Sequence, residues 1–325
     1  MSVSKYDIEL SAGEDQTSHG LMMALVGANK RVLDVGCSTG YLAKALREHG
    51  NAVSGIEYDQ ASADKARPFL DHVVVGDLEA PGIYDDFEDA SFDVVVFGDV
   101  LEHLRDPLPV LRGARRLLVP GGSVVISVPN IAHGDVRLAL LRGKFDYRST
   151  GLLDETHVRF FTRSNLDAFL REAGMVPVDV RATYAPLFGT ELQLDPADYP
   201  AELVEAVRQD PESGVYQFVL RAAPDDVVRA ESQVAWRLLD ANRELAELRA
   251  AHSQCQARAE HTDVALNAMT VDRDKVVREL AAAEQALQTA LDGRESAEQL
   301  VARTEATKTF RAVALPRRVY GRLRG

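Results

Sequence analysis

Short apolar runs alternate with amphipathic helical stretches across residues 31–130, and this alternation limits the possible folds more than any other feature. It is typical of a parallel sheet that helices cover on both faces. Two later apolar runs predict two further strands. The seven predicted strands are RVLDVG (31–36), AVSGIEYD (52–59), VVVGD (73–77), FDVVVFGD (92–99), SVVISVPN (123–130), MVPVDVRATY (175–184) and VYQFVLRAAP (215–224). We therefore expect one doubly wound α/β domain over residues 31–224, preceded by a helical lid at residues 1–30.

The segment after residue 226 has a different composition, dominated by Ala, Glu, Leu, Arg and Gln. One heptad frame runs through it from Val227 to Val301, and most of its a and d positions are apolar. This pattern indicates a long coiled-coil helix over residues 225–305. A continuous helix of that length would form a rod of roughly 110 Å. A solvated single helix rich in alanine is the alternative.

The last segment, residues 306–325, reverses the charge of the chain. The formal net charge of the whole chain is −13, yet six cations and no acid occur from Lys308 onwards. An acidic body repels phosphate backbones, which argues against general nucleic-acid binding. Only two cysteines occur, far apart, and no apolar run is long enough to span a bilayer. We therefore expect a cytoplasmic protein.

The run LDVGCSTG (33–40) is typical of a strand that ends in a glycine-rich turn and opens a helix. Glycine lets the backbone approach a ligand closely, and a helix N-terminus offers unpaired N–H groups. Dinucleotide-binding domains require G-x-G-x-x-G, and the serine at position 38 weakens a nicotinamide interpretation without removing it. Glu57 ends the second strand, where a carboxylate can accept hydrogen bonds from both ribose hydroxyls. Asp77 ends the third strand, where it would reach the edge of an adenine.

Taken in this order, the motifs resemble the class I S-adenosylmethionine-dependent methyltransferases over about residues 17–222. The segments DVLEHLRDP (99–107) and LLVPGGSVVISVPN (117–130) extend the likeness. The resemblance implies a Rossmann-like sheet of seven strands closed by an antiparallel hairpin, with S-adenosyl-L-methionine as the cofactor. It places ten residues at the cofactor: Asp34, Gly36, Cys37, Ser38, Gly40, Glu57, Asp77, Leu78, Asp99 and His103.

The segment 128–162 resembles particular groups within these methyltransferases. It is similar to methyltransferases among bacterial glycan- and sugar-modifying enzymes, and more distantly to quinone-biosynthesis O-methyltransferases, in which a Thr-His pair lies over the substrate side. The resemblance implies His157 as general base for a hydroxyl acceptor, because an imidazole titrates near neutral pH. It also implies substrate contacts for Asn130, His133, Asp154, Glu155 and Arg159. As alternatives, His157 only pins its loop or binds a metal, although the sequence shows no ligand cluster and we expect no metal.

These inferences lead to an S-adenosylmethionine-dependent O-methyltransferase that acts on a hydroxyl of a sugar or a lipid-linked glycan. Two alternatives stay open: a small-metabolite O-methyltransferase of quinone or secondary-metabolite type, and a non-catalytic cofactor-binding scaffold of a glycan-synthesis complex. The coiled coil would assemble the protein into a homo-oligomer. The basic tail would dock it on a glycan-synthesis complex or at the inner face of the membrane, where anionic lipids attract basic residues. A tail that only keeps the protein in solution is the alternative.

Overall fold

The computed structural model of the chain describes residues 16–225, 232–259 and 277–295. The chain divides into two compact units, Met1–Asp226 and Val227–Gly325. The first unit contains the sheet and the motifs that the sequence analysis connects with chemistry. The second unit contains the heptad segment.

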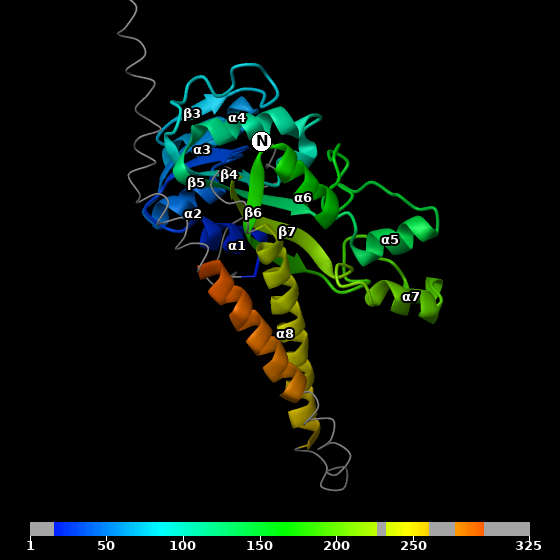
Figure 1. Cartoon of the computed structure of the whole chain (residues 1–325). Coiled ribbons are helices and arrows are strands. Elements are labelled where there is room, and N and C mark those ends of the chain that lie inside the picture. Colours follow the sequence, from blue (N-terminus) through cyan, green and yellow to red (C-terminus); the bar gives the residue numbers. More distant parts are fainter. Residues whose placement is uncertain (1–15, 226–231, 260–276, 296–325) are drawn as a thin grey trace, which may run out of the picture. The chain divides into compact units, whose positions relative to one another are not determined.

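Seven strands form one sheet in the first unit, in the spatial order β3-β2-β1-β4-β5-β7-β6 (Figure 1). The strands β1 to β5 pair in parallel, whereas β7 pairs antiparallel with both β5 and β6. The predicted seven strands and their closing antiparallel hairpin are confirmed. The bounds are β1 Arg31–Val35, β2 Ala52–Glu57, β3 Val73–Val75, β4 Phe92–Gly98, β5 Leu118–Pro129, β6 Met175–Tyr184 and β7 Val215–Pro224. The strand order reverses between β1 and β4, and ligands of open α/β sheets bind outside the carboxyl ends of the strands at such a point.

Helices connect the strands, and one boundary differs from the sequence prediction. The strand β5 already starts at Leu118, which pairs with Phe92 of β4 ahead of a register shift, so the helix before it ends at Leu117. The α-helices of this unit are α1 Ser18–Val26, α2 Tyr41–Glu48, α3 Gln60–Ala66, α4 Pro107–Leu117, α5 Gly134–Leu141, α6 Arg163–Glu172 and α7 Ala201–Arg208. The 3₁₀ helices are η1 Arg67–Phe69, η2 Leu101–His103 and η3 Pro196–Asp198.

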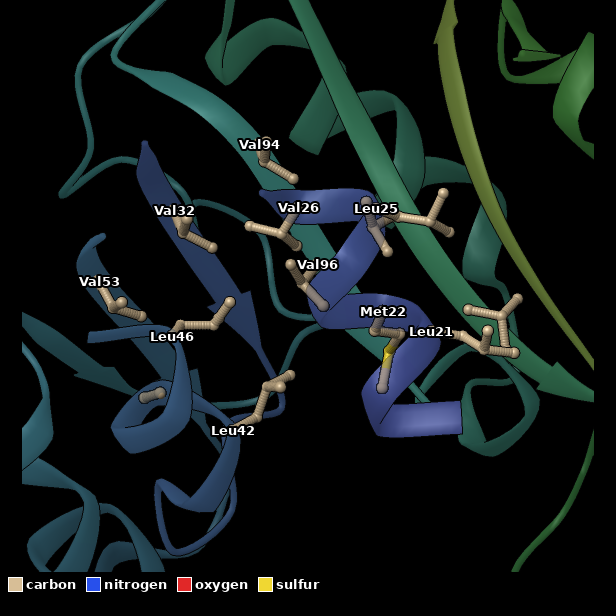
Figure 2. Packing of buried hydrophobic residues seen from close by; sticks show 13 residues of the cluster. Leu21, Met22, Leu25, Val26, Val32, Leu42, Leu46, Val53, Val94 and Val96 are labelled. Carbon is tan, nitrogen blue, oxygen red and sulfur yellow. The ribbon is translucent and has the colours of Figure 1, made fainter. Parts of the chain in front are cut away.

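A cluster of buried apolar side chains joins the first helix to the sheet (Figure 2). Burying one leucine of this kind contributes about 2 kcal/mol. Side chains on the opposite face of the same strands, such as Leu33 and Val95, are also fully buried, so both faces are covered. The helix α1 falls within the predicted lid, yet it belongs to the core, while residues 1–15 lie outside the described residues. The labelled members of the cluster are Leu21, Met22, Leu25, Val26, Val32, Leu42, Leu46, Val53, Val94 and Val96.

The second unit contains the helix α8 (Ser232–Ala259) and a further helical stretch at residues 277–295. An ion pair of 3.4 Å joins Arg249 of α8 to Glu284 of the second stretch. In one straight helix these two residues would lie roughly 50 Å apart, at 1.5 Å per residue. The chain therefore doubles back, and the prediction of a single continuous rod is wrong.

The side-chain exposure in this unit matches the predicted heptad frame only in part, because Ala235, Trp236 and Leu239, which lie outside its a and d positions, are also buried. Leu238 and Leu245 of α8 are buried, and Leu280 and Leu287 are partly buried between exposed neighbours. Residues 260–276 and the basic tail at 306–325 lie outside the described residues. None of the described helices combines the length and the hydropathy that a membrane crossing requires.

Candidate active site

The glycine-rich turn after β1 keeps its backbone in left-handed conformations. Gly36 has a φ of 75°, Ser38 of 48° and Gly40 of 82°. A Cβ atom on Gly36 would lie 2.7 Å from a methyl carbon of Val100, and one on Gly40 would lie 2.8 Å from the Cα of Ala66. Only glycine therefore fits these two positions without displacing a neighbour.

Glu57, the last residue of β2, braces this turn. One carboxylate oxygen accepts a hydrogen bond of 2.8 Å from the backbone N–H of Ser38, and the other accepts one of 2.9 Å from the N–H of Asp59. A carboxylate has about four acceptor sites, so the partly exposed Glu57 can still accept hydrogen bonds from bound hydroxyls. The fold thus brings the predicted ribose-binding acid to the predicted turn.

Asp34 is buried immediately before the turn. Its Oδ2 atom has no hydrogen-bond partner among the described residues. Burial and, secondly, the charge of Glu57 raise the pKa of Asp34 to about 7. A buried carboxyl with an open acceptor atom suits a cationic ligand. Cys37 is buried as well, and its sulfur would lie 2.7 Å from a Cβ on Gly55, so this side chain packs against β2.

The other predicted cofactor residues follow β3 and β4. Asp77 is exposed and Leu78 is partly exposed. Asp99, directly after β4, has a φ of 55° and accepts a hydrogen bond of 2.8 Å from the Ser127 hydroxyl. It also accepts one from the amide of Gln217, a residue on β7 that the sequence analysis did not single out. Polar groups therefore line one edge of the sheet, at the carboxyl ends of β1 to β4.

His157 lies on a loop that the turn after β4 holds in place. The backbone carbonyl of Glu102 accepts hydrogen bonds of 2.9 Å from the N–H groups of both Val158 and Arg159. The Arg159 guanidinium also donates to the carbonyl of Arg105, from Nε at 2.8 Å and from Nη2 at 2.5 Å. Arg159 thus fastens the loop, and its substrate contact stays a prediction.

The imidazole of His157 is buried and lies edge to face with that of His103. The ring centroids are 4.8 Å apart and the ring planes meet at 68°. Burial and, secondly, the charge of His103 lower the pKa of His157, while the Asp154 carboxylate and a hydrogen bond to the Leu152 backbone act in the opposite direction. His157 is therefore neutral at pH 7, the state in which an imidazole can accept a proton.

Thr156 connects the second histidine to an acid. Its hydroxyl donates a hydrogen bond of 2.6 Å to Oδ1 of Asp154 and lies 3.1 Å from Nδ1 of His103. Asp154 is buried, so it orders the loop from within. Glu155 is exposed beside it. His103, predicted to border the cofactor, is thereby also in contact with the loop that carries His157.

Glu102 completes a group that the sequence analysis missed. Both of its carboxylate oxygens are buried without a hydrogen-bond partner among the described residues, and burial raises the pKa of Glu102 well above its usual value. Ligand atoms of Glu102, His103 and His157 lie within 4.8 Å of one another, a donor set that a divalent cation could use. The sequence places His157 far from the other two, and only the docked loop brings the three together.

Asn130 and His133 serve the packing of the chain. Asn130 is fully buried, and its Nδ2 donates to the carbonyl of Val215 at 2.9 Å. Both ring nitrogens of the buried His133 are engaged, one by the carbonyl of Ala185 at 3.0 Å and one by the N–H of Asp135 at 3.1 Å. Their polar atoms therefore have partners in the chain, and their substrate contacts stay a prediction.

A family model described as a methyltransferase domain matches residues 18–180, which include the glycine turn, Glu57 and the His157 loop. The chain belongs to this methyltransferase-domain family. Its cofactor is S-adenosylmethionine, as the resemblance of its motifs implies, and the nicotinamide alternative is set aside.

Relatives of this methyltransferase include two proteins named ubiquinone biosynthesis O-methyltransferase. The protein from Pseudomonas aeruginosa PAO1 is 34% identical over 182 residues, which cover 49% of this chain and 71% of the relative. The protein from Thiobacillus denitrificans is 31% identical over 187 residues, covering 56% of this chain and 80% of the relative. Their names agree with the prediction of an O-methyltransferase.

Two solved structures of S-adenosylmethionine-dependent methyltransferases are also similar. The one from Archaeoglobus fulgidus is 18% identical, with a TM-score of 0.45, and covers 63% of this chain and 94% of its own. The one from Mesorhizobium loti is 20% identical, with a TM-score of 0.43, and covers 65% of this chain and 99% of its own.

The residues at the sheet edge of this methyltransferase fit its cofactor. The open Oδ2 of Asp34 offers an acceptor to a cation, and S-adenosylmethionine carries a sulfonium and an ammonium group. Glu57 offers acceptors for ribose hydroxyls, and the turn at Gly36 and Gly40 permits a close backbone approach. When bound, the cofactor supplies an activated methyl group, which leaves the protein to align the acceptor and manage its proton.

Proposed function

We propose that this methyltransferase transfers the methyl group to a ring hydroxyl of a quinone-type precursor. The names of its relatives support this acceptor, and the chain covers 71% and 80% of the length of the two relatives described above. The proposal replaces a sugar or glycan hydroxyl as the leading interpretation. A glycan acceptor rests only on the resemblance of residues 128–162 and on the basic tail.

The observation that carries the proposal is the buried imidazole of His157, packed against His103 at the edge of the sheet where the predicted cofactor residues lie. An imidazole whose pKa is lowered is a weak base, so it serves best where the acceptor loses its proton easily. A phenolic hydroxyl has a pKa of about 10, as tyrosine does. The hydroxyl of a sugar ring is far less acidic. His157 is therefore better matched to a ring hydroxyl than to a glycan.

Three groups near the acceptor have defined roles in this reaction: the imidazoles of His157 and His103 and the backbone carbonyl of Glu102. His157 accepts the proton of the hydroxyl as its oxygen attacks the methyl carbon. His103, held by Thr156, lies against the imidazole, and its charge adds to the effect of burial in lowering the pKa of His157. The backbone carbonyl of Glu102 keeps the loop docked beside the carboxyl end of β4.

The test uses S-adenosylmethionine labelled on its methyl group, the full chain, hydroxylated quinone precursors and, separately, a lipid-linked glycan fraction. We expect label in the ring compounds only. The His157→Ala variant should lose about 10²–10⁴-fold in turnover while it binds the cofactor with unchanged affinity. Label that enters only the glycan fraction would instead identify a sugar hydroxyl as the methyl acceptor. Unchanged turnover of the variant would remove His157 as the base.

We further propose that the heptad segment of the second unit assembles the enzyme into a homo-oligomer. The partly buried Leu280 and Leu287 support this, since a two-helix unit leaves both incompletely covered. Replacing both by Asp should lower the mass in light scattering to that of one chain, whereas replacing the exposed Gln288 by Asp should not.

Docking of the basic tail at anionic membranes stays a prediction. Co-sedimentation with phosphatidylglycerol vesicles tests it, for the full chain and for a variant lacking residues 306–325.

A further inference from the structure

We propose that Glu191 is a positioning residue that holds the loop of His157 through the backbone of Leu152. The proposal rests on the role of His157 in the proposed function. Glu191 lies in the segment between β6 and α7, outside every motif that the sequence analysis connected with chemistry. Its place in the reaction follows from two hydrogen bonds and one steric constraint.

Both oxygens of the Glu191 carboxylate have donors from distant parts of the chain. Oε1 accepts a hydrogen bond of 2.5 Å from the backbone N–H of Leu152, and Oε2 accepts one of 3.0 Å from the hydroxyl of Tyr216 on β7. Burial, and next the Glu191 charge, raise the pKa of Tyr216, so its hydroxyl keeps its proton and remains a donor. The carboxylate thus links β7 to the loop that carries His157.

Leu152 transmits this contact to the base. Its N–H is held by Glu191. The carbonyl of the adjacent Gly151 accepts a hydrogen bond of 3.1 Å from the N–H of Asp154, whose own carbonyl accepts one of 3.0 Å from the N–H of His157. The Leu152 side chain is buried in an apolar cluster with Leu153 and Leu192, so this short stretch has little freedom once Glu191 is bound. Glu191 therefore fixes the stretch of backbone that places the imidazole of His157.

The Glu191 carboxylate packs so tightly against Gly151 that a side chain at position 151 would clash with it. Gly151 has a φ of +92°, and a Cβ atom at this position would lie 2.1 Å from Oε1 of Glu191. Any other residue would displace the carboxylate from Leu152. Salt bridges to Glu191 do not occur in the described part of the chain, so its two neutral donors account for its placement.

Loss of Glu191 should therefore lower turnover and spare cofactor binding. A misplacement of a reacting group by about 1 Å can cost as much as 10²-fold in rate, and we expect a decrease of about 10- to 100-fold in kcat for Glu191→Ala. The KM for the acceptor should change much less, because Glu191 acts on the base. The affinity for S-adenosylmethionine should not change.

The experiment is a double-mutant cycle between Glu191 and His157 in the full chain. Because Glu191 acts through His157, Glu191→Ala should have no further effect in a His157→Ala background. Glu191→Gln keeps an acceptor oxygen for Leu152 and should restore most of the activity, whereas the shorter Glu191→Asp should not. The matched control is Glu202→Gln, which changes an exposed carboxyl on the neighbouring helix α7.

The outcomes separate this proposal from the proposed function. Full kcat in Glu191→Ala, or effects of the two substitutions that simply multiply, would overturn the positioning role while leaving His157 as the base. Full kcat in His157→Ala would overturn the proposed function, and the positioning role with it. If Glu191→Ala does not fold, Glu191→Asp keeps the charge and gives the same comparison. A melting temperature that falls in proportion to kcat across the series would also count against the proposal.

Discussion

The rings of His103 and His157 lie edge to face with centroids 4.8 Å apart, although one histidine follows β4 and the other follows β5. The contact exists because the backbone of the His157 loop donates two hydrogen bonds to the carbonyl of Glu102, next to His103. It brings a second titratable ring to the proposed base. The pH dependence of the enzyme should therefore depend on both histidines.

The first prediction concerns His103→Asn. The charge of His103 lowers the pKa of His157, so its removal should move that pKa upwards, toward 6.5. Because only the neutral imidazole accepts a proton, turnover rises as the pH rises through this pKa. The acid limb of the kcat profile between pH 5 and 8 should therefore shift to higher pH in the variant. His49→Asn, at an exposed histidine after α2, should leave the profile unchanged.

The second prediction concerns divalent metal ions. Glu102, His103 and His157 converge within 4.8 Å, and Zn²⁺ binds such groups readily. If His157 is the base, added Zn²⁺ should inhibit turnover by occupying its free nitrogen, and a chelator should reverse the inhibition. Glu102→Gln should weaken the inhibition because it removes one ligand. Activation by the ion would instead show that the three residues form a metal centre of the enzyme.

The third prediction concerns Asp34 and the cofactor. Burial and, secondly, the charge of Glu57 raise the pKa of Asp34 to about 7, so protonated Asp34 is present at neutral pH. A cationic ligand favours its ionised form, so the affinity for S-adenosylmethionine should rise as the pH rises through 7, with release of a proton. Isothermal titration calorimetry in buffers of different ionisation enthalpy measures that proton. Asp34→Asn should abolish the dependence, and Asp86→Asn, at an exposed loop carboxyl, should preserve it.

The fourth prediction separates backbone strain from crowding in the glycine turn. Gly36→Ala combines a φ of 75° with a Cβ atom 2.7 Å from Val100. Gly143→Ala has a comparable φ of 70° but open space around the new methyl group, so it should cost only the backbone strain of about 1–2 kcal/mol. We expect a larger loss of unfolding free energy for Gly36→Ala in urea, together with weaker cofactor binding. Equal losses for the two variants would show that Val100 yields without cost.

Much of the predicted cofactor site could be inferred from short segments of the sequence. The apolar alternation predicted seven strands, which the sheet confirms. The positions of Gly36, Gly40 and Glu57 at strand ends predicted a binding edge, and the fold brings these residues together there. These features depend on near neighbours in the chain, because strand periodicity and left-handed turns are properties of short segments. The register shift of β5 was missed, since it depends on pairing with a separate strand.

The acceptor side was decided by the tertiary structure. His133 was a reasonable substrate contact in the sequence, but the fold engages both of its ring nitrogens. Glu191 had no sequence signal, and its carboxylate matters only because Leu152 and Tyr216 meet there. The heptad pattern predicted one continuous helix, yet the ion pair between Arg249 and Glu284 shows that the chain doubles back.

The sequence by itself therefore determined the sheet, the glycine turn and the cofactor chemistry of this protein, because each is encoded within a few consecutive residues. The tertiary structure alone decided which groups surround His157. Hydrogen bonds and burial among Glu102, His103, Leu152 and Glu191 join segments far apart in the chain, and no local pattern records which distant side chains will meet.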